Sequence, residues 1–196
     1  MLHFFGIISA VLAFLAVVPY VRDVFKGTTK PNQASWLIWV ALLVLALLSQ
    51  RIGGAKDSLL LTIGDLIGSS VILGLAIFKG TNKWHWVDKA SLVGAGIGFI
   101  CLFVFKQPIV GLAITIFIDA CGAVPTIRKS FIDPKSETLS TWIIVGVAGI
   151  FGAISVGSFN LVILIYPIYL IVSNFAVAGA MLIGSLRHRS VEQPKN

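Results

Sequence analysis

Long apolar runs separated by short polar links make up almost the whole chain. The runs cover about 4–22, 34–50, 57–78, 88–105, 107–128, 139–156 and 159–185. A helix of about 20 apolar residues crosses the roughly 30 Å of hydrocarbon in a bilayer. The runs are continuous and lack the period-two alternation of a membrane strand, so we expect seven transmembrane helices.

The composition excludes a soluble or a disordered protein. Apolar residues make up 57% of the 196 residues and charged residues only 12%, against roughly 45–50% and 25% in soluble domains. The net charge of +7 does not indicate a nucleic-acid surface, because the basic residues lie between and after the apolar runs. We therefore expect a multi-pass membrane protein with no nucleic-acid partner.

Nothing in the pattern points to an enzyme. His3, His85 and His188 lie at or beyond the ends of the runs, and Cys101 and Cys121 lie inside apolar runs without a CxxC motif. There is no nucleophile–base pair and no cluster with metal-ligand spacing. We therefore expect no catalytic residue, no metal and no cofactor.

The basic residues predict the orientation in the membrane. The links after the first, third and fifth runs and the C-terminal tail carry twelve Lys and Arg, whereas the other links carry three. Cytoplasmic loops carry the excess of Lys and Arg in membrane proteins. The N-terminus is therefore expected outside and the C-terminus in the cytoplasm.

The chain contains an internal repeat. Residues 18–25 (VPYVRDVF) match residues 124–131 (VPTIRKSF) at an offset of 106, and the same offset pairs Trp36 with Trp142. The repeat predicts a three-helix unit at 1–79, a linker helix at 80–106, a second three-helix unit at 107–186 and a tail at 187–196. Because the linker helix restores the direction of the chain, the two bundles are expected to be parallel, in a 3+1+3 plan.

This plan and the repeated motif resemble the SWEET, SemiSWEET and PQ-loop superfamily of transporters. That family has a proline late in the first helix of each repeat, then a basic residue and a Lys-Ser type segment. The second copy here has Pro125, Arg128 and KSETLS at 135–140, and the first has Pro19, Arg22 and KPNQAS at 30–35. The chain resembles a divergent bacterial member, which implies a place in the bacterial cytoplasmic membrane.

The resemblance implies a secondary transporter that moves a small polar solute by alternating access, either as a uniporter or coupled to protons. An alternative is a membrane receptor or signalling protein, because a fold does not determine function. The expected partners are the solute, protons in the coupled case, and the lipid bilayer. The sequence leaves open whether the protein forms a homo-oligomer.

Asp65 and Asp119 are the only charged residues deep inside the predicted spans. They lie about 12 Å and about 18 Å from the outer helix ends, counted at 1.5 Å per residue. Such residues usually line a cavity or relay protons, and desolvation favours the neutral form, so either could take up a proton. The alternative is a protonated Asp that is hydrogen-bonded across helices. By the resemblance, Asp65 stands where the family has its substrate-binding asparagine.

Three further residues are candidates for contact with the solute. At an offset of 104, Tyr169 corresponds to Asp65, and Asn174 corresponds to Ser70. Each could bind the solute, or could only form a hydrogen bond within a packed helix interface.

The last candidates concern movement. Pro19 and Pro125 are expected to kink their helices, and the resemblance implies that they act as hinges, with a simple helix terminus as the alternative. Trp39 stands where the family has a second proline, so it is a candidate cytoplasmic gate, with interface anchoring as the alternative.

Overall fold

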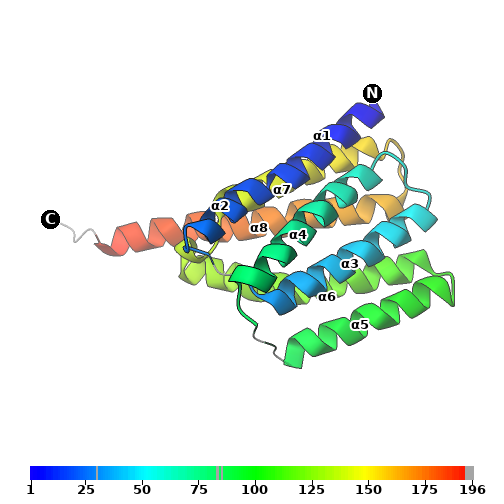
Figure 1. The fold of residues 1–196 in the computed structure, drawn as a ribbon. Helices are drawn as coiled ribbons and strands as arrows, with labels where there is room; N and C mark the ends of the chain where they lie inside the picture. Colours follow the sequence, from blue (N-terminus) through cyan, green and yellow to red (C-terminus); the bar gives the residue numbers. More distant parts are fainter. Residues whose placement is uncertain (30, 83, 85, 193–196) are drawn as a thin grey trace.

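The computed structural model describes residues 1–29, 31–82, 84 and 86–192, and it is built from helices (Figure 1). In chain order these are α1 (Leu2–Leu15), α2 (Val17–Phe25), α3 (Gln33–Ile52), α4 (Leu59–Lys79), α5 (Trp86–Phe103), α6 (Pro108–Ile132), the 3-10 helix η1 (Pro134–Ser136), α7 (Leu139–Ser155) and α8 (Leu161–Glu192). Over these ranges no β-strand occurs, and a single parallel bridge joins Asn32 to Thr81. The predicted all-helical class is confirmed.

Five helical segments of the described chain are long and apolar enough to cross a membrane. They are Leu2–Phe25 (α1 with α2), α3, α4, α6 and Leu161–Arg187 of α8. Helix α7 is apolar but has 17 residues, and α5 has 18. These helices indicate a membrane-embedded protein, while a count of seven spans stays a prediction.

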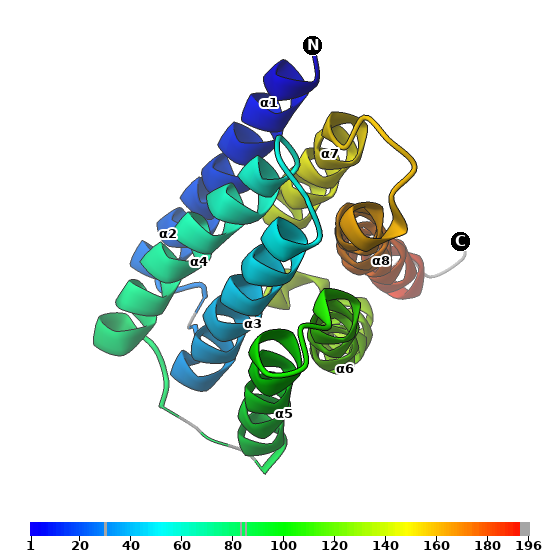
Figure 2. The same cartoon turned by 90° about the vertical axis from the view of Figure 1, so that its right-hand side faces the viewer.

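The helices pack in the same order in the two parts of the chain. Helix α4 packs between α1 and α3, and α8 packs between α7 and α6 (Figure 2). The two groups meet reciprocally, because α1 packs on α7 while α3 packs on α6. Helix α5 lies at the edge, against α6 and α3 (Figure 2).

The helix starts follow the sequence repeat. Helix α6 begins at Pro108 and α1 at Leu2, and this offset of 106 also relates Leu139, where α7 begins, to Gln33, where α3 begins. Even a buried hydroxyl recurs at this offset, since Ser9 is buried on α1 and Thr115 on α6. The repeated sequence therefore folds into elements that start at matching places.

Glycines allow close helix crossings. A Cβ added at Gly64 of α4 would lie 2.8 Å from the Ala10 Cα of α1, so backbone meets backbone there. At Gly149 of α7 the same atom would lie 3.2 Å from the Pro167 carbonyl oxygen of α8. Small residues at such crossings let apolar helices gain packing contacts, which drive helix association in a bilayer.

The two ends of the bundle differ in their contacts. At the N-terminal end, His3 of α1 lies 2.8 Å from the Asp57 carboxylate in the link before α4. We call the other end the basic end, because Arg22, Lys79 and Arg187 lie near its helix termini.

The central core joins all the large helices except α5. Its cluster contains Ala13, Leu43, Ala46, Leu61, Leu112, Ala148, Tyr166 and Leu170, which are all buried. Many large apolar side chains remain exposed on the outside, among them Phe4, Val18, Ile67, Phe117 and Val172. An apolar exterior around a packed core is what a helix bundle presents to lipid.

Candidate functional site

Asp119 and Tyr169 meet in the middle of the bundle. The Tyr169 hydroxyl on α8 donates a 2.6 Å hydrogen bond to the Asp119 carboxylate on α6. Hydroxyl-to-carboxylate bonds of 2.5–2.7 Å are typical of charge-assisted pairs. The bond fixes the direction of the Asp119 side chain.

Asp65 reaches the same place from the other half of the chain. It lies on α4, accepts a 3.5 Å hydrogen bond from the Ser69 hydroxyl and is close enough to Asp119 for their charges to interact. The buried Tyr166 of α8 is an electrostatic neighbour of both carboxylates. The two acidic residues that the sequence placed at mid-depth therefore come together.

The site is rich in oxygen atoms and poor in positive charge. Among the described residues neither Asp65 nor Asp119 forms a salt bridge, and no third carboxylate, His or Cys joins them. Two nearby carboxylates repel each other when both are ionised, which favours uptake of a proton or a cationic group between them. Both residues are partly buried between the helices.

Trp39 lies beside this site. Its indole is a second polar neighbour of Asp119, and its ring packs edge-on against Trp36 with centroids 4.8 Å apart. Trp36 in turn packs edge-on against Tyr20 at 5.2 Å. These three aromatic residues form a row of packed rings between Asp119 and the basic end, where α2 ends and α3 begins. The residue predicted as a gate is thus adjacent to Asp119, and its gating role stays a prediction.

The other two candidates form hydrogen bonds within their own helices. The Asn174 amide donates to the Leu170 carbonyl of its own helix at 2.8 Å, and it is buried. The Ser70 side chain is exposed and donates to the Leu66 carbonyl at 2.7 Å. Ser69, one position earlier, is the serine that contacts Asp65. The four-residue spacing from Asp65 was the available signal, since residues i and i+4 share a helix face.

The helix is interrupted near one of the two prolines predicted as hinges and is continuous at the other. The first span is interrupted at Ala16, between α1 and α2, and Pro19 is the third residue of α2. Because proline has no N–H, the Leu15 carbonyl loses its usual helical partner. Helix α6 continues from Pro108 to Ile132 across Pro125, whose side chain lies outside the described residues. The interruption therefore occurs in the first repeat at this motif.

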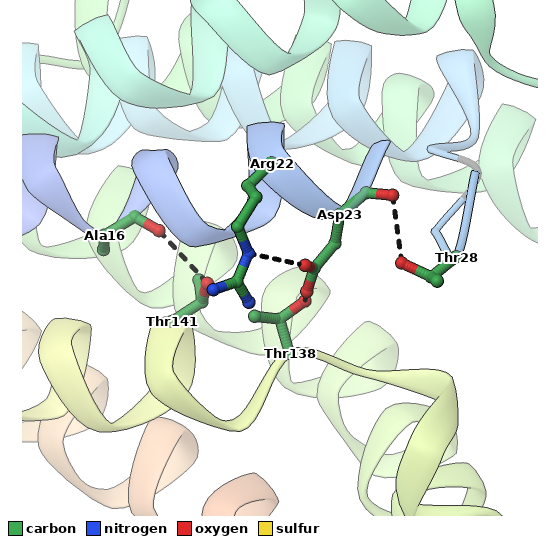
Figure 3. Close-up of polar contacts among 6 residues, drawn as sticks. All are labelled: Ala16, Arg22, Asp23, Thr28, Thr138 and Thr141. Atoms are coloured by element: carbon green, nitrogen blue, oxygen red, sulfur yellow. Dashed lines mark hydrogen bonds and ion pairs between the residues drawn. The ribbon is translucent and has the colours of Figure 1, made fainter. Parts of the chain in front are cut away.

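Polar contacts at the basic end join α2 to α7, next to this interruption (Figure 3). The Thr138 hydroxyl, just before α7, donates to the Asp23 carboxylate at 2.9 Å, and Arg22 donates to the same carboxylate at 3.0 Å. The Thr141 hydroxyl donates to the Ala16 carbonyl at 3.1 Å. We call this group the Asp23 contact, and it was not expected from the sequence.

Thr138→Val is expected to lower the free energy of unfolding by about 1 kcal/mol, because the partly buried Asp23 carboxylate loses a donor. The matched control is Thr126→Val, whose hydroxyl donates to the Gly122 carbonyl of its own helix at 3.0 Å. The measurement is unfolding by SDS titration in mixed micelles. Equal losses in the two variants would show that the Asp23 contact adds no stability.

No protein-family model, curated protein or solved structure matches this chain.

Proposed function

We propose that this protein is a secondary transporter that moves a small polar solute across a membrane by alternating access. The observation that carries the proposal is the meeting of Asp65 and Asp119 beside the Tyr169 hydroxyl, in the interior of apolar helices. Ionisable residues are rare within membrane helices and mark solute or proton pathways. The two carboxylates come from different repeats and meet at the interface between them. Transporters built from repeats bind their solute at this interface.

The proposed architecture has seven spans in a 3+1+3 plan. The first bundle is α1 with α2, α3 and α4, the linker is α5, and the second bundle is α6, α7 and α8. The reciprocal packing of α1 on α7 and α3 on α6 supports a pseudo-two-fold axis along the membrane normal. This plan supports membership of the SWEET and PQ-loop type of transporter.

The site suits a solute that donates hydrogen bonds. An ionised carboxylate only accepts them, so hydroxyl or ammonium groups are suitable partners for Asp65 and Asp119. Tyr169 donates to one Asp119 oxygen, and the Trp39 indole is the other polar neighbour of this carboxylate. In the proton-coupled alternative, one carboxylate takes up a proton after the solute has left. This proton replaces the ammonium group of the solute as the partner of the carboxylate.

The contacts between the bundles differ on the two sides of the site. On the N-terminal side, Leu61 lies one turn before Asp65 and Leu112 two turns before Asp119, and the buried Ser9 hydroxyl of α1 donates to the Ala148 carbonyl of α7 at 2.8 Å. On the basic side the joint includes the polar Asp23 contact next to the break at Ala16. Rocking of the bundles would open one joint while it closes the other.

The test is solute uptake by the purified protein in liposomes. A thermal-shift screen of amines, amino acids and sugars selects binders, because a ligand that binds the folded state raises its stability. Radiolabelled binders are then offered to the liposomes. Saturable uptake supports the transporter, whereas binding without uptake contradicts it and favours a receptor.

Labelling with a membrane-impermeant thiol reagent tests the orientation. In a variant with Cys101 and Cys121 replaced by Ser, a cysteine in place of Lys56 is expected to react from outside intact cells. A cysteine in place of Lys83 should react only after the cells are opened. The reason is the excess of Lys and Arg on the Lys83 side. Reaction of both positions from outside would contradict the N-out, C-in topology.

A further inference from the structure

An apolar groove on the outer surface lies between α6 and α8, away from Asp65 and Asp119. It is shallow and open to the outside, with a volume of about 630 Å³ near the basic end. Its walls include Val124 and Phe131 of α6 and Phe175 and Ile183 of α8. Its floor includes Gly179, where an added Cβ would meet no atom within 4 Å. The groove is therefore open space that a flexible apolar chain can occupy.

The lining residues form one stripe on each helix. On α6, Val124, Arg128 and Phe131 follow one another at spacings of four and three. On α8, Gly179 and Ile183 continue at a spacing of four to Arg187. Residues at these spacings share a helix face. Each stripe therefore includes one arginine, and both arginines lie near the same end of the groove.

These two arginines flank the basic end of the groove. The Arg187 guanidinium lies 5.7 Å from the Phe131 ring centroid, and Arg128 is three residues before Phe131 on the same helix. Both arginines are exposed, and in the described part of the chain neither forms a salt bridge. A guanidinium presents several N–H donors in a plane that matches phosphate oxygens.

We propose that this groove binds an anionic phospholipid. One acyl chain lies against Phe175, Gly179 and Ile183, and the phosphate lies between Arg128 and Arg187. The charge complementarity supports this occupant, because basic pockets between membrane helices on the cytoplasmic side bind anionic headgroups. A second copy of this chain would bring the same two arginines to the groove, and like charges disfavour that pairing.

The charge test is native mass spectrometry of the full chain in detergent with phosphatidylglycerol or phosphatidylcholine of identical acyl chains. The wild type is expected to retain phosphatidylglycerol preferentially. Arg128→Gln and Arg187→Gln should each weaken this retention about fivefold, the factor for one basic residue near an anionic headgroup. The matched control is Lys79→Gln, because Lys79 lies 4.7 Å over the Phe25 ring but lines no part of this groove.

The shape test fills the groove. Gly179→Leu is expected to lower retention of phosphatidylglycerol at least fivefold while the protein stays monodisperse, since the new side chain enters open space. The control is Gly96→Leu on α5, an exposed position where an added Cβ also meets nothing within 4 Å. Glycerol 3-phosphate, which has the phosphate but no acyl chain, should not displace the lipid.

Three results would overturn the proposal. The first is wild-type retention of phosphatidylglycerol by the arginine variants or by Gly179→Leu. The second is an equal loss in Lys79→Gln or Gly96→Leu, which would assign the effect to general charge or general surface change. The third is displacement by glycerol 3-phosphate, or a mass that corresponds to a second protein copy in place of the lipid.

Discussion

Asn in place of Asp119 is expected to lower solute uptake into liposomes by more than tenfold. Asp119 is the carboxylate that Tyr169 orients through a 2.6 Å hydrogen bond, so it is the best-ordered acceptor of the site. A hydrogen bond to a charged group contributes about 1.5–3 kcal/mol, and each 1.4 kcal/mol corresponds to about a factor of ten in affinity. The measurement is the initial rate of uptake at several solute concentrations.

Two companion variants separate the roles inside the site. Tyr169→Phe removes only the hydroxyl that orients Asp119, so we expect weaker solute binding by about tenfold with uptake still measurable at high concentration. Asp65→Asn is expected to remove the dependence of uptake on pH, because one of the two facing carboxyls can no longer exchange a proton. Both variants should fold, since Asn and Phe keep the side-chain shapes.

The control for these variants is Asp57→Asn. Asp57 is an aspartate at the N-terminal end of the bundle, where its partner is His3. Its replacement is expected to leave uptake unchanged. Normal uptake by Asp119→Asn, or pH-dependent uptake by Asp65→Asn equal to the wild type, would contradict the assignment of the site.

Gly64→Ala is expected to give the largest loss of stability among single methyl additions on α4. The new Cβ would lie 2.8 Å from the Ala10 Cα, and the atoms it meets are backbone, which cannot move aside as a side chain can. Overpacking of this kind costs about 1–3 kcal/mol. The measurement is the midpoint of unfolding by SDS titration, with the yield of monodisperse protein alongside.

Gly74→Ala is the matched control on the same helix. An added Cβ there meets no atom within 4 Å, so only the intrinsic preference for a helix changes. Ala is favoured over Gly in a helix interior by roughly 0.5–1 kcal/mol. The control should therefore be as stable as the wild type or slightly more stable. A loss in Gly74→Ala equal to that in Gly64→Ala would contradict the close crossing of α1 and α4.

Helix positions could be predicted from the sequence with little error. The run predicted at 57–78 is α4 at Leu59–Lys79, and the run at 139–156 is α7 at Leu139–Ser155. The physical reason is that a lipid-facing helix must be apolar along its whole length, so its ends are marked where polar residues resume. The break at Ala16 was not visible in the same way, because apolar residues continue on both sides of it.

Membership of the site was predicted less completely. Asp65 and Asp119 could be selected because a charged group inside an apolar run is unusual, and Tyr169 because it corresponds to Asp65 in the repeat. The choice between Ser69 and Ser70 depends on which side of α4 faces α6. Hydropathy does not distinguish those sides, since lipid and the packed interior are both apolar.

The Asp23 contact shows a further limit. In the sequence, Arg22 and the segment 135–140 that contains Thr138 belong to the repeated motif, and Asp23 was not singled out. They interact because α1 and α2 run beside α7, from the other repeat. A pairing between residues 115 positions apart has no local signature in the chain.

The sequence alone determined the helical class, the places where helices start and stop, the repeat and the two acidic positions. Those properties follow from local composition and from comparison of the chain with itself. Only the tertiary structure decided which helices touch, that Tyr169 bonds to Asp119, and that Ser69 contacts Asp65. These pairings depend on how each helix is rotated about its axis, and small-residue crossings such as Gly64 on Ala10 set that rotation through close packing.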